Sequence, residues 1–440
     1  MSEKLHIEFD WLNPDVGSEI DQTFAASIGV AVSEEYLTRN DDLAGKTVRN
    51  QMRGCAWHLA TWIAANWWRL RWEPETPRWW EDVDWRITHG MASAGGGFVW
   101  PNAVFASDGD SIGIAMRPKS KGVPYEPIRY LNHVHARITA AEFEQRVDEF
   151  MEGVLSRHDA MGVKDESLVQ LWKEILAERH DPETSERRKL EAMAGYDPDE
   201  APDELLTQLL EDKEQLGKSA LAEVASESRH TTGAALQPIR ELGSSRKPKL
   251  GGFRVSMPEL NRLLVNKVDG DRPWQTGSKL AQIARKQWGF GDEPIKNNRL
   301  ADLLGAKPAM FTDKATVGAQ MPFGLRAGGN AACHIYFDRP SVTTRRFAAS
   351  RLIGDHLYFA SQERLLPATH AKTSRQKFQR AFAQEFLCPI DALLEKIQTK
   401  QPDDDDISEA ATHFHVSPLM IRTTLVNKGE LDREALAWGV

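Results

Sequence analysis

The sequence predicts a multi-domain α+β protein with a Trp-rich N-terminal α+β domain, an acidic helical region and a C-terminal α+β domain. At 440 residues, the chain is longer than one ordinary domain. Segments with the apolar spacing of helices alternate with short strand-like runs. Residues 141–225 carry 23 acidic and 10 basic residues, a net charge of −13, whereas residues 226–300 carry 7 and 14, a net charge of +7. Such a reversal often separates structural units, although two solvated faces would give the same pattern. The expected boundaries are 1–138, 139–240, 241–400 and 401–440.

The first domain is expected to combine a helix with a small sheet. Eight tryptophans lie within residues 57–85, and the last of them is Trp85. The segment RNQMRGCAWHLATWIAANWWRLRW (49–72) has apolar residues at three- and four-residue steps, which predicts a helix that ends before Pro74. FVWPNAVFAS (98–107) and SIGIAMRP (111–118) flank an Asp-Gly turn and predict a β-hairpin. IRYLNHVHARI (128–138) is expected to extend that sheet.

The middle and C-terminal parts are read mainly from helical periodicity. Thr139 is a suitable N-cap for a helix with apolar residues from 143 to 154, and residues 168–176 repeat the pattern. ELGSSRKPKLGG (241–252) has the composition of a linker. Further on, helices are predicted at 277–289, 298–305, 342–360, 374–387 and 407–429, with a strand at 331–338.

Composition and termini restrict the class of protein. No run of about 18 apolar residues is present, so no membrane partner is expected. The N-terminus MSEKLHIEFDW lacks the pattern of a secretory signal. Three cysteines are too few for a disulfide framework, which favours a reducing, cytoplasmic localisation. The net charge of −9 argues against a protein coated in nucleic acid.

One stretch nevertheless has the chemistry of a nucleic-acid contact. WWRLRW (67–72) places Arg69 and Arg71 between Trp68 and Trp72, a combination suited to stacking on bases and pairing with phosphates. Lys119 and Lys121 add a short basic loop, RPKSK. The structural alternative is a core helix over which the arginine stems lie.

The segments between residues 257 and 430 together resemble the ImmA/IrrE family of zinc metallopeptidases. GSKLAQIARKQWGFGDEPI and NNRLADLLGAKPAMF are similar to the opening helices of that family. CHIYFDRPSVTTRRFAASRLIGDHL is similar to its strand followed by the metal-binding helix, and RAFAQEFLCP to its later helix. AATHFHVSPLMIRTTLVNKG resembles its C-terminal helix pair. The resemblance implies a zincin-like α+β domain with a His-Glu-x-x-His motif.

The chain departs from this family at the four positions that carry the chemistry. The first histidine falls on Arg351, the general-base glutamate on Leu352, the second histidine on Asp355 and the third ligand on Phe378. Catalytic zinc needs three protein ligands, and a guanidinium repels the ion. We therefore predict no catalytic residue, no metal ligand and no cofactor.

The altered positions suggest a replacement for the metal. His356 and Glu385 are possible groove residues, but His356 lies ~100° around the helix from position 355. Arg351 and Asp355 are four residues apart, and we expect them to form an ion pair in the former metal groove. The alternative is that both point into solvent. The strand at 331–338 is the expected edge for pairing with an extended peptide.

These observations predict a catalytically inactive ImmA/IrrE-like protein that acts as a sensor, scaffold or regulator by binding another protein. The resemblance implies a bacterial stress response, mobile-element control or defence against phage, with a repressor-type protein or a defence effector as partner. Three alternatives remain. The chain could be an active metallopeptidase with unrecognised ligands or a nucleic-acid-binding module built on the N-terminal half. Otherwise the C-terminal fold is only a scaffold, and the Trp-rich domain makes every contact.

Overall fold

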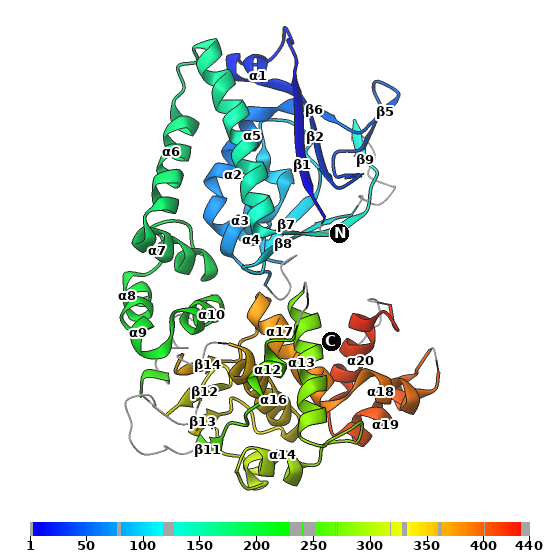
Figure 1. The fold of residues 1–440 in the computed structure, drawn as a ribbon. Helices are drawn as coiled ribbons and strands as arrows, with labels where there is room; N and C mark the ends of the chain where they lie inside the picture. The colour runs from blue at the N-terminus through cyan, green and yellow to red at the C-terminus, as the bar shows by residue number, and fades with distance from the viewer. Residues whose placement is uncertain are drawn as a thin grey trace. The chain divides into compact units, whose positions relative to one another are not determined.

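The computed structural model describes residues 3–76, 81–117, 127–228, 239–241, 252–268, 270, 272–316, 318–327, 332–359, 363–399 and 401–432. It confirms a mixed α+β protein with more than one compact unit (Figure 1). The N-terminal unit comprises Met1–Leu206 with Ala371–Thr373. The C-terminal unit comprises Thr207–His370 with Ser374–Val440.

The N-terminal unit combines short antiparallel sheets with helices. Its strands are β1 (Leu5–Trp11), β2 (Ala25–Val32), β3 (Glu35–Tyr36), β4 (Asn40–Asp42), β5 (Thr47–Arg49), β6 (Met52–Cys55), β7 (Ala103–Ser107), β8 (Ser111–Met116), β9 (Ile128–Tyr130) and β10 (Val134–Thr139). Its helices are α1 (Glu19–Thr23), α2 (Ala56–Ala65), α3 (Trp67–Trp72), α4 (Val83–His89), the 3-10 turn η1 (Met91–Ala94), α5 (Ala140–Met161), α6 (Ser167–His180) and α7 (Pro182–Met193).

The predicted hairpin is confirmed. β7 and β8 pair in an antiparallel register that sets Ser107 opposite Ile112, and Asp108 accepts from the backbone N–H groups that close the turn. β10 adds to β8, as expected for the third run, whereas β9 joins β4 and β5 instead. The remaining sheet has β1, β3 and β6 around β2, and α5 packs against β1.

The single helix predicted for residues 49–72 is wrong. Residues 52–55 form β6, because their backbone pairs with β2. The helical part then divides into α2 and α3 at Asn66, whose side-chain amide donates to Trp62 O at 2.8 Å. Local bonding of this kind competes with the helical ladder. The apolar periodicity is nevertheless real, since Trp57, Trp67 and Trp68 are all buried.

The C-terminal unit contains one four-stranded antiparallel sheet covered by helices. Its strands are β11 (Gly252–Ser256), β12 (Phe323–Arg326), β13 (Ala332–Tyr336) and β14 (Leu365–Pro367). Its helices are α9 (Lys213–Leu216), α10 (Lys218–Ser228), α12 (Arg262–Val265), α13 (Pro273–Gln287), α14 (Asn297–Leu303), α15 (Ala309–Thr312), α16 (Val342–Tyr358), α17 (Ser374–Leu387), α18 (Ile390–Ile397), α19 (Asp404–Phe414) and α20 (Pro418–Lys428). Helix α8 (Asp203–Glu211) crosses the boundary between the units.

The strand order in this sheet is β11-β13-β12-β14, which corrects the expected position of β13. β13 pairs with β11 on one side and with β12 on the other, so neither of its edges is open to a peptide. The sheet ends instead at β11 and β14, and α10 packs against β14. Helices α13, α16 and α17 pack closely together (Figure 1).

The acidic region does not form a domain of its own. Its first helices belong to the N-terminal unit, because Phe143, Phe150 and Trp172 are buried in the same core as Trp67. Helices α9 and α10 belong to the C-terminal unit. The expected tail at 401–440 is also integrated, since Phe414 is buried in the core of the C-terminal unit. Within the described part of the chain, no helix has both the length and the apolar character to cross a membrane.

Candidate functional site

Helix α16, which carries the positions that the resemblance equates with metal ligands, is buried along most of its length. Arg345 and Arg346 near its start are both fully buried. The guanidinium of Arg345 donates to Met310 O at 2.9 Å and to Ala315 O at 2.6 Å. Arg346 donates to the Asn297 side chain at 2.7 Å. These bonds satisfy backbone carbonyls of neighbouring loops and fix the helix in place.

About two and a half turns further on, Asp355 is fully buried and pairs with Arg375 of α17. Arg375 Nε donates to Asp355 Oδ1 at 2.8 Å and Nη2 to Oδ2 at 2.6 Å, a bidentate arrangement. The third nitrogen of the guanidinium, Nη1, donates to Glu363 Oε2 at 2.8 Å and to Ser219 Oγ at 3.0 Å. We call Asp355, Glu363 and Arg375 the carboxylate–arginine cluster.

Arg351 does not pair with Asp355, so the expected ion pair is wrong. Its Nη2 donates to Thr369 O at 2.7 Å and also to the side-chain oxygen of Gln376, while Nη1 reaches Ala368 O at 3.4 Å. The two side chains meet different residues of α17, Gln376 for Arg351 and Arg375 for Asp355. The solvent alternative is also wrong, since both residues are buried.

Leu352 and Phe378 are core residues in the structure. Leu352 is fully buried in the apolar core of the C-terminal unit. Phe378 stacks on Tyr358 with ring centroids 4.6 Å apart and meets Phe359 edge-on. The hydrogen bonds from α17 to Arg351 and Asp355 are made by Gln376 and Arg375.

The other two expected groove residues are His356, which directly follows Asp355 in α16, and Glu385 of α17. Burial lowers the pKa of His356 to about 4, with a further contribution from the charge of Arg326, and its Nδ1 atom has no hydrogen-bond partner. Glu385 is buried, accepts from Gln282 at 3.0 Å and lies 3.8 Å from Lys428 Nζ. The charge of Asp355 opposes the lowering of the pKa of His356.

Helix α10 closes the space beside this cluster, a feature that the sequence did not indicate. At its first turn, the Ser219 backbone N–H donates to Glu363 Oε1 at 2.9 Å. Near its last turn, Glu227 accepts from the backbone N–H of His370 at 2.8 Å and lies 2.8 Å from the ring Nδ1. Glu223 and Glu227 are nearly fully buried. The acidic residues of α10 thus face a strongly basic part of its own unit.

The electrostatics differ between the two central arginines. Burial lowers the pKa of Arg351 to about 9, and the nearby Arg380 adds to this effect, although Asp355, Glu227 and Glu223 oppose it. Burial also disfavours the charge on Arg375, but the carboxylates of Asp355, Glu223 and Glu363 outweigh it and raise its pKa. Both guanidiniums remain charged at neutral pH.

The residues at the former metal position do not fit zinc. The groups gathered there are guanidiniums, amides and carboxylates, and the carboxylates of Asp355 and Glu363 are already held by hydrogen bonds from Arg375. Zinc requires deprotonated nitrogen, sulfur or oxygen donors in a tetrahedron. A dication beside Arg351 and Arg375 would also meet strong repulsion. This position therefore offers no metal chemistry.

The predicted nucleic-acid contacts are not available as a surface. Trp68 is buried and donates to Glu178 at 2.9 Å. Arg69 is buried and pairs with Glu73 at 2.7 Å and Asp84 at 2.7 Å. Both side chains are therefore buried and paired within the N-terminal unit.

The remaining predicted contacts are also engaged or lie elsewhere. Arg71 pairs with Glu144 and donates to Gly109 O at 2.9 Å, and its guanidinium covers the ring of Trp72. Stacking and phosphate pairing by these two residues would require breaking those contacts. Lys119 and Lys121 lie outside the described residues.

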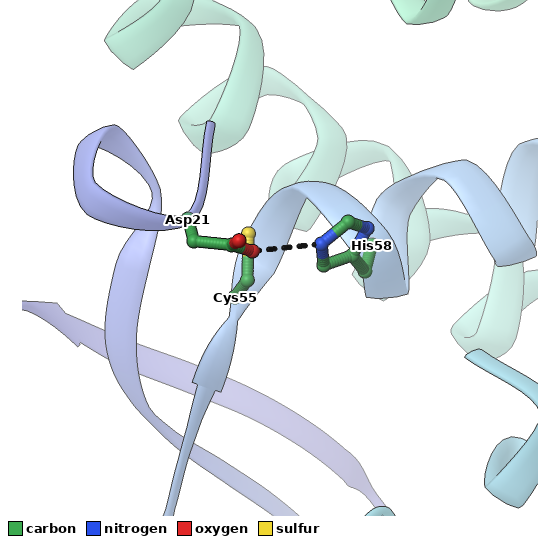
Figure 2. A group of neighbouring side chains, drawn as sticks. All are labelled: Asp21, Cys55 and His58. Atoms are coloured by element: carbon green, nitrogen blue, oxygen red, sulfur yellow. Dashed lines mark hydrogen bonds and ion pairs between the residues drawn. The ribbon is translucent and has the colours of Figure 1, made fainter. Parts of the chain in front are cut away.

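A second cluster escaped the sequence reasoning altogether. Asp21, Cys55 and His58 place one ligand-type atom each within 4.8 Å of the others (Figure 2). The Asp21 carboxylate lies 2.9 Å from His58 Nε2. The sequence held one signal for this cluster. Cys55 and His58 are three residues apart at the start of a helix, and residues at that spacing share one helical face. Asp21 comes from a separate helix, and its proximity is visible only in the fold.

Comparisons with known proteins do not place the chain in a family. No protein-family model matches it, and neither a curated protein nor a solved structure does.

Proposed function

We propose that this protein acts by binding another protein rather than by cutting it, and that its C-terminal unit is a non-catalytic ImmA/IrrE-like domain. The observation that carries the proposal is the buried pairing of Asp355 with Arg375 where the resemblance would put a zinc ligand. This arrangement completes the polar interactions of the carboxylate without a metal. Leu352, at the position of the general base, cannot accept a proton from water.

The resemblance suggests the type of partner and setting. A repressor-type protein or a defence effector fits a family associated with stress responses, mobile elements and defence against phage. A reducing, cytoplasmic setting belongs to the proposal and is supported by three cysteines that are all free thiols. The protein would then act as a sensor, scaffold or regulator.

The structure changes how such a partner would be held. A peptide cannot add to β13, because both of its edges are paired, and α10 packs against the edge strand β14. Binding would therefore use the outer surface of the C-terminal unit. It could use the old groove only after α10 has been displaced. This requirement distinguishes the protein from a peptidase with an open cleft.

The test uses the full-length chain and purified candidate partners, with repressor-type proteins first. We expect a stable complex by size-exclusion chromatography with light scattering. We also expect the partner to keep its intact mass after incubation with zinc. Hydrogen exchange in the complex should show protection within residues 207–370 or 374–432. Metal-dependent fragments of the partner would refute the non-catalytic proposal. Protection confined to residues 3–206 would instead favour the scaffold alternative.

The rival in which the N-terminal half binds nucleic acid is weakened by the pairing of Arg69 and Arg71. Titration of the full chain with single- and double-stranded DNA and RNA across a salt series addresses it. Steep salt dependence, with tight binding at low salt, would revive this rival.

A further inference from the structure

We propose that Asp21, Cys55 and His58 bind a divalent transition-metal ion of the zinc class. Their donor atoms, a carboxylate oxygen, a sulfur and an imidazole nitrogen, are the three kinds that zinc uses in proteins. All three lie within 4.8 Å of one another. Donors around a tetrahedral zinc stand roughly 3.3–3.7 Å apart, so shifts on the order of 1 Å would close the site.

The local structure orients each ligand. Cys55 ends β6 and is the N-cap residue of α2, and His58 lies one turn into that helix, so both project from the same face. Asp21 comes from α1 and points toward them (Figure 2). Ser18 donates from its backbone N–H at 3.1 Å and from its hydroxyl at 2.7 Å, both to Asp21 Oδ2. The other oxygen, Oδ1, is left facing His58.

Further neighbours shape the site in the way that outer-shell groups shape metal centres. A Cβ atom on Gly96 would lie 2.2 Å from Cδ2 of the His58 ring, so the backbone of this glycine packs directly against the imidazole. Gly96 has φ +68°, which the absence of a side chain permits. The carboxylate of Asp21 and the ring of His58 are 24% and 27% exposed. Water can therefore reach the fourth coordination position.

In the metal-free form, the thiol of Cys55 is protonated and the carboxylate of Asp21 is charged. Burial raises the pKa of the Cys55 thiol to about 11, so the sulfur is protonated at neutral pH without a metal. Burial would raise the pKa of Asp21, but hydrogen bonds from Ser18 and His58 lower it, which keeps the carboxylate charged. A thiol of this kind is a poor nucleophile, which argues against a Cys–His catalytic pair.

Binding is a substitution without a change of oxidation state. The S–H bond of Cys55 breaks, the sulfur–metal bond forms and the proton passes to solvent. The hydrogen on His58 Nε2, which faces Asp21 in the metal-free form, is lost to solvent while Nδ1 takes one up, so that Nε2 can offer its lone pair to the metal with no net change in the protons of the ring. Asp21 Oδ1 exchanges its hydrogen bond to the ring for a bond to the metal. The ion would thereby tie α1 to the start of α2.

The test titrates the full-length protein, purified without metal, with Co²⁺ and then displaces the cobalt with Zn²⁺. We expect the near-ultraviolet charge-transfer absorption of a thiolate–cobalt bond, with release of one proton per ion. Cys55→Ser should abolish the band, and His58→Ala should weaken cobalt binding at least tenfold. Cys388→Ser, at a buried thiol of the other unit, and His6→Ala, at an exposed histidine, are the matched controls and should retain the band.

Several outcomes would overturn the proposal. The charge-transfer band could be absent in the wild type, or it could persist in Cys55→Ser. Weak cobalt binding that none of the substitutions changes would indicate an adventitious ion only. If Cys55→Ser does not fold, Asp21→Asn decides the matter, because it removes the charged ligand and keeps a side chain of the same shape. It should weaken cobalt binding at least tenfold, and unchanged cobalt affinity in this variant and in His58→Ala would refute the metal site.

Discussion

At the scale of single residues, Arg351 and Arg375 show how the partner determines what a buried charge does. Both guanidiniums are nearly inaccessible to water. Arg375 faces the carboxylates of Asp355 and Glu363, whereas Arg351 is bound only to carbonyl and amide oxygens. The cost of burial is therefore offset by direct ion pairs at Arg375, whereas the hydrogen bonds of Arg351 are made to neutral oxygens and carboxylates act on it without a direct ion pair.

This contrast predicts unequal effects of two substitutions on stability. Arg375→Ala should lower the free energy of unfolding by about 3–5 kcal/mol, because Asp355 would remain buried without a cation. Arg351→Ala should cost less, since it leaves only neutral acceptors unpaired. Denaturant unfolding followed by circular dichroism measures both. Lys396→Ala, which removes an exposed pair with Glu409, is the control and should cost under about 1 kcal/mol. Equal losses for the two arginines would contradict this account.

His356 predicts a dependence of stability on pH. Burial lowers its pKa from 6.5 to about 4 in the folded protein. The unfolded chain binds the proton more readily between these values. The stabilising contribution is therefore complete above pH 6.5 and is lost as the pH falls to 4. His356→Gln should flatten the stability profile over this window by up to about 3 kcal/mol. Urea unfolding from pH 7.5 to 4.5 measures it, and an unchanged slope relative to the exposed control His6→Gln would refute it.

At the scale of elements, glycines allow the helices around the former metal position to approach closely. A Cβ atom on Gly354 of α16 would lie 2.6 Å from Cγ of Phe382 on α17. On α13, a Cβ atom on Gly277 would lie 2.5 Å from the Phe378 carbonyl oxygen. Contacts below 3 Å cannot be accommodated without movement. These two glycines therefore set how closely α17 packs against its two neighbours.

Gly354→Ala should destabilise the protein even though alanine is the better helix former. The gain in helix propensity is about 1 kcal/mol. Displacement of the Phe382 ring should exceed it, because overpacking of a core typically costs about 1–3 kcal/mol. Thermal unfolding of the variant should show a lower Tm than the wild type. Ser408→Ala on the exposed face of α19 provides the control. A raised Tm for Gly354→Ala would show that α16 and α17 can separate freely.

At the scale of the whole molecule, the boundary between the two compact units lies earlier in the chain than the composition indicates. The linker-like segment 241–252 suggested a division near residue 240. The compact units instead divide at Leu206 and Thr207, within α8. The physical reason is α10, whose Ser219 and Glu227 bond to Glu363 and His370 of the C-terminal unit. A helix held in this way belongs to the unit that it covers.

Two fragments test this boundary. A fragment of residues 203–440 retains α8 to α10 and should unfold cooperatively. A fragment of residues 241–440 lacks α10, so Glu363 loses a hydrogen-bond donor and the side of β14 is uncovered. We expect the shorter fragment to have a lower Tm and weaker near-ultraviolet circular dichroism. Identical thermal transitions would show that α10 contributes nothing to this unit.

Local sequence determined the features that depend on near neighbours. The α+β class, the hairpin at Asp108, the helix that begins after Thr139 and the helix at 342–358 all follow from periodicity and capping, and the structure confirms them. The replacement of each catalytic residue type could also be read directly, once the resemblance supplied the positions. The resemblance itself remains a prediction.

Only the tertiary structure decided the contacts between distant segments. Helical spacing brought Arg351 and Asp355 onto one face, but Arg375, 20 residues beyond Asp355, holds the carboxylate bidentately, and Arg351 bonds to Thr369 and Gln376 instead. In the same way, β13 became central once β11 and β12 paired with it, and Asp21 came to lie beside His58, 37 residues away. Periodicity specifies which face a residue occupies. The packing of other elements against that face determines which group it meets, and this explains why both candidate sites had to be found in the fold.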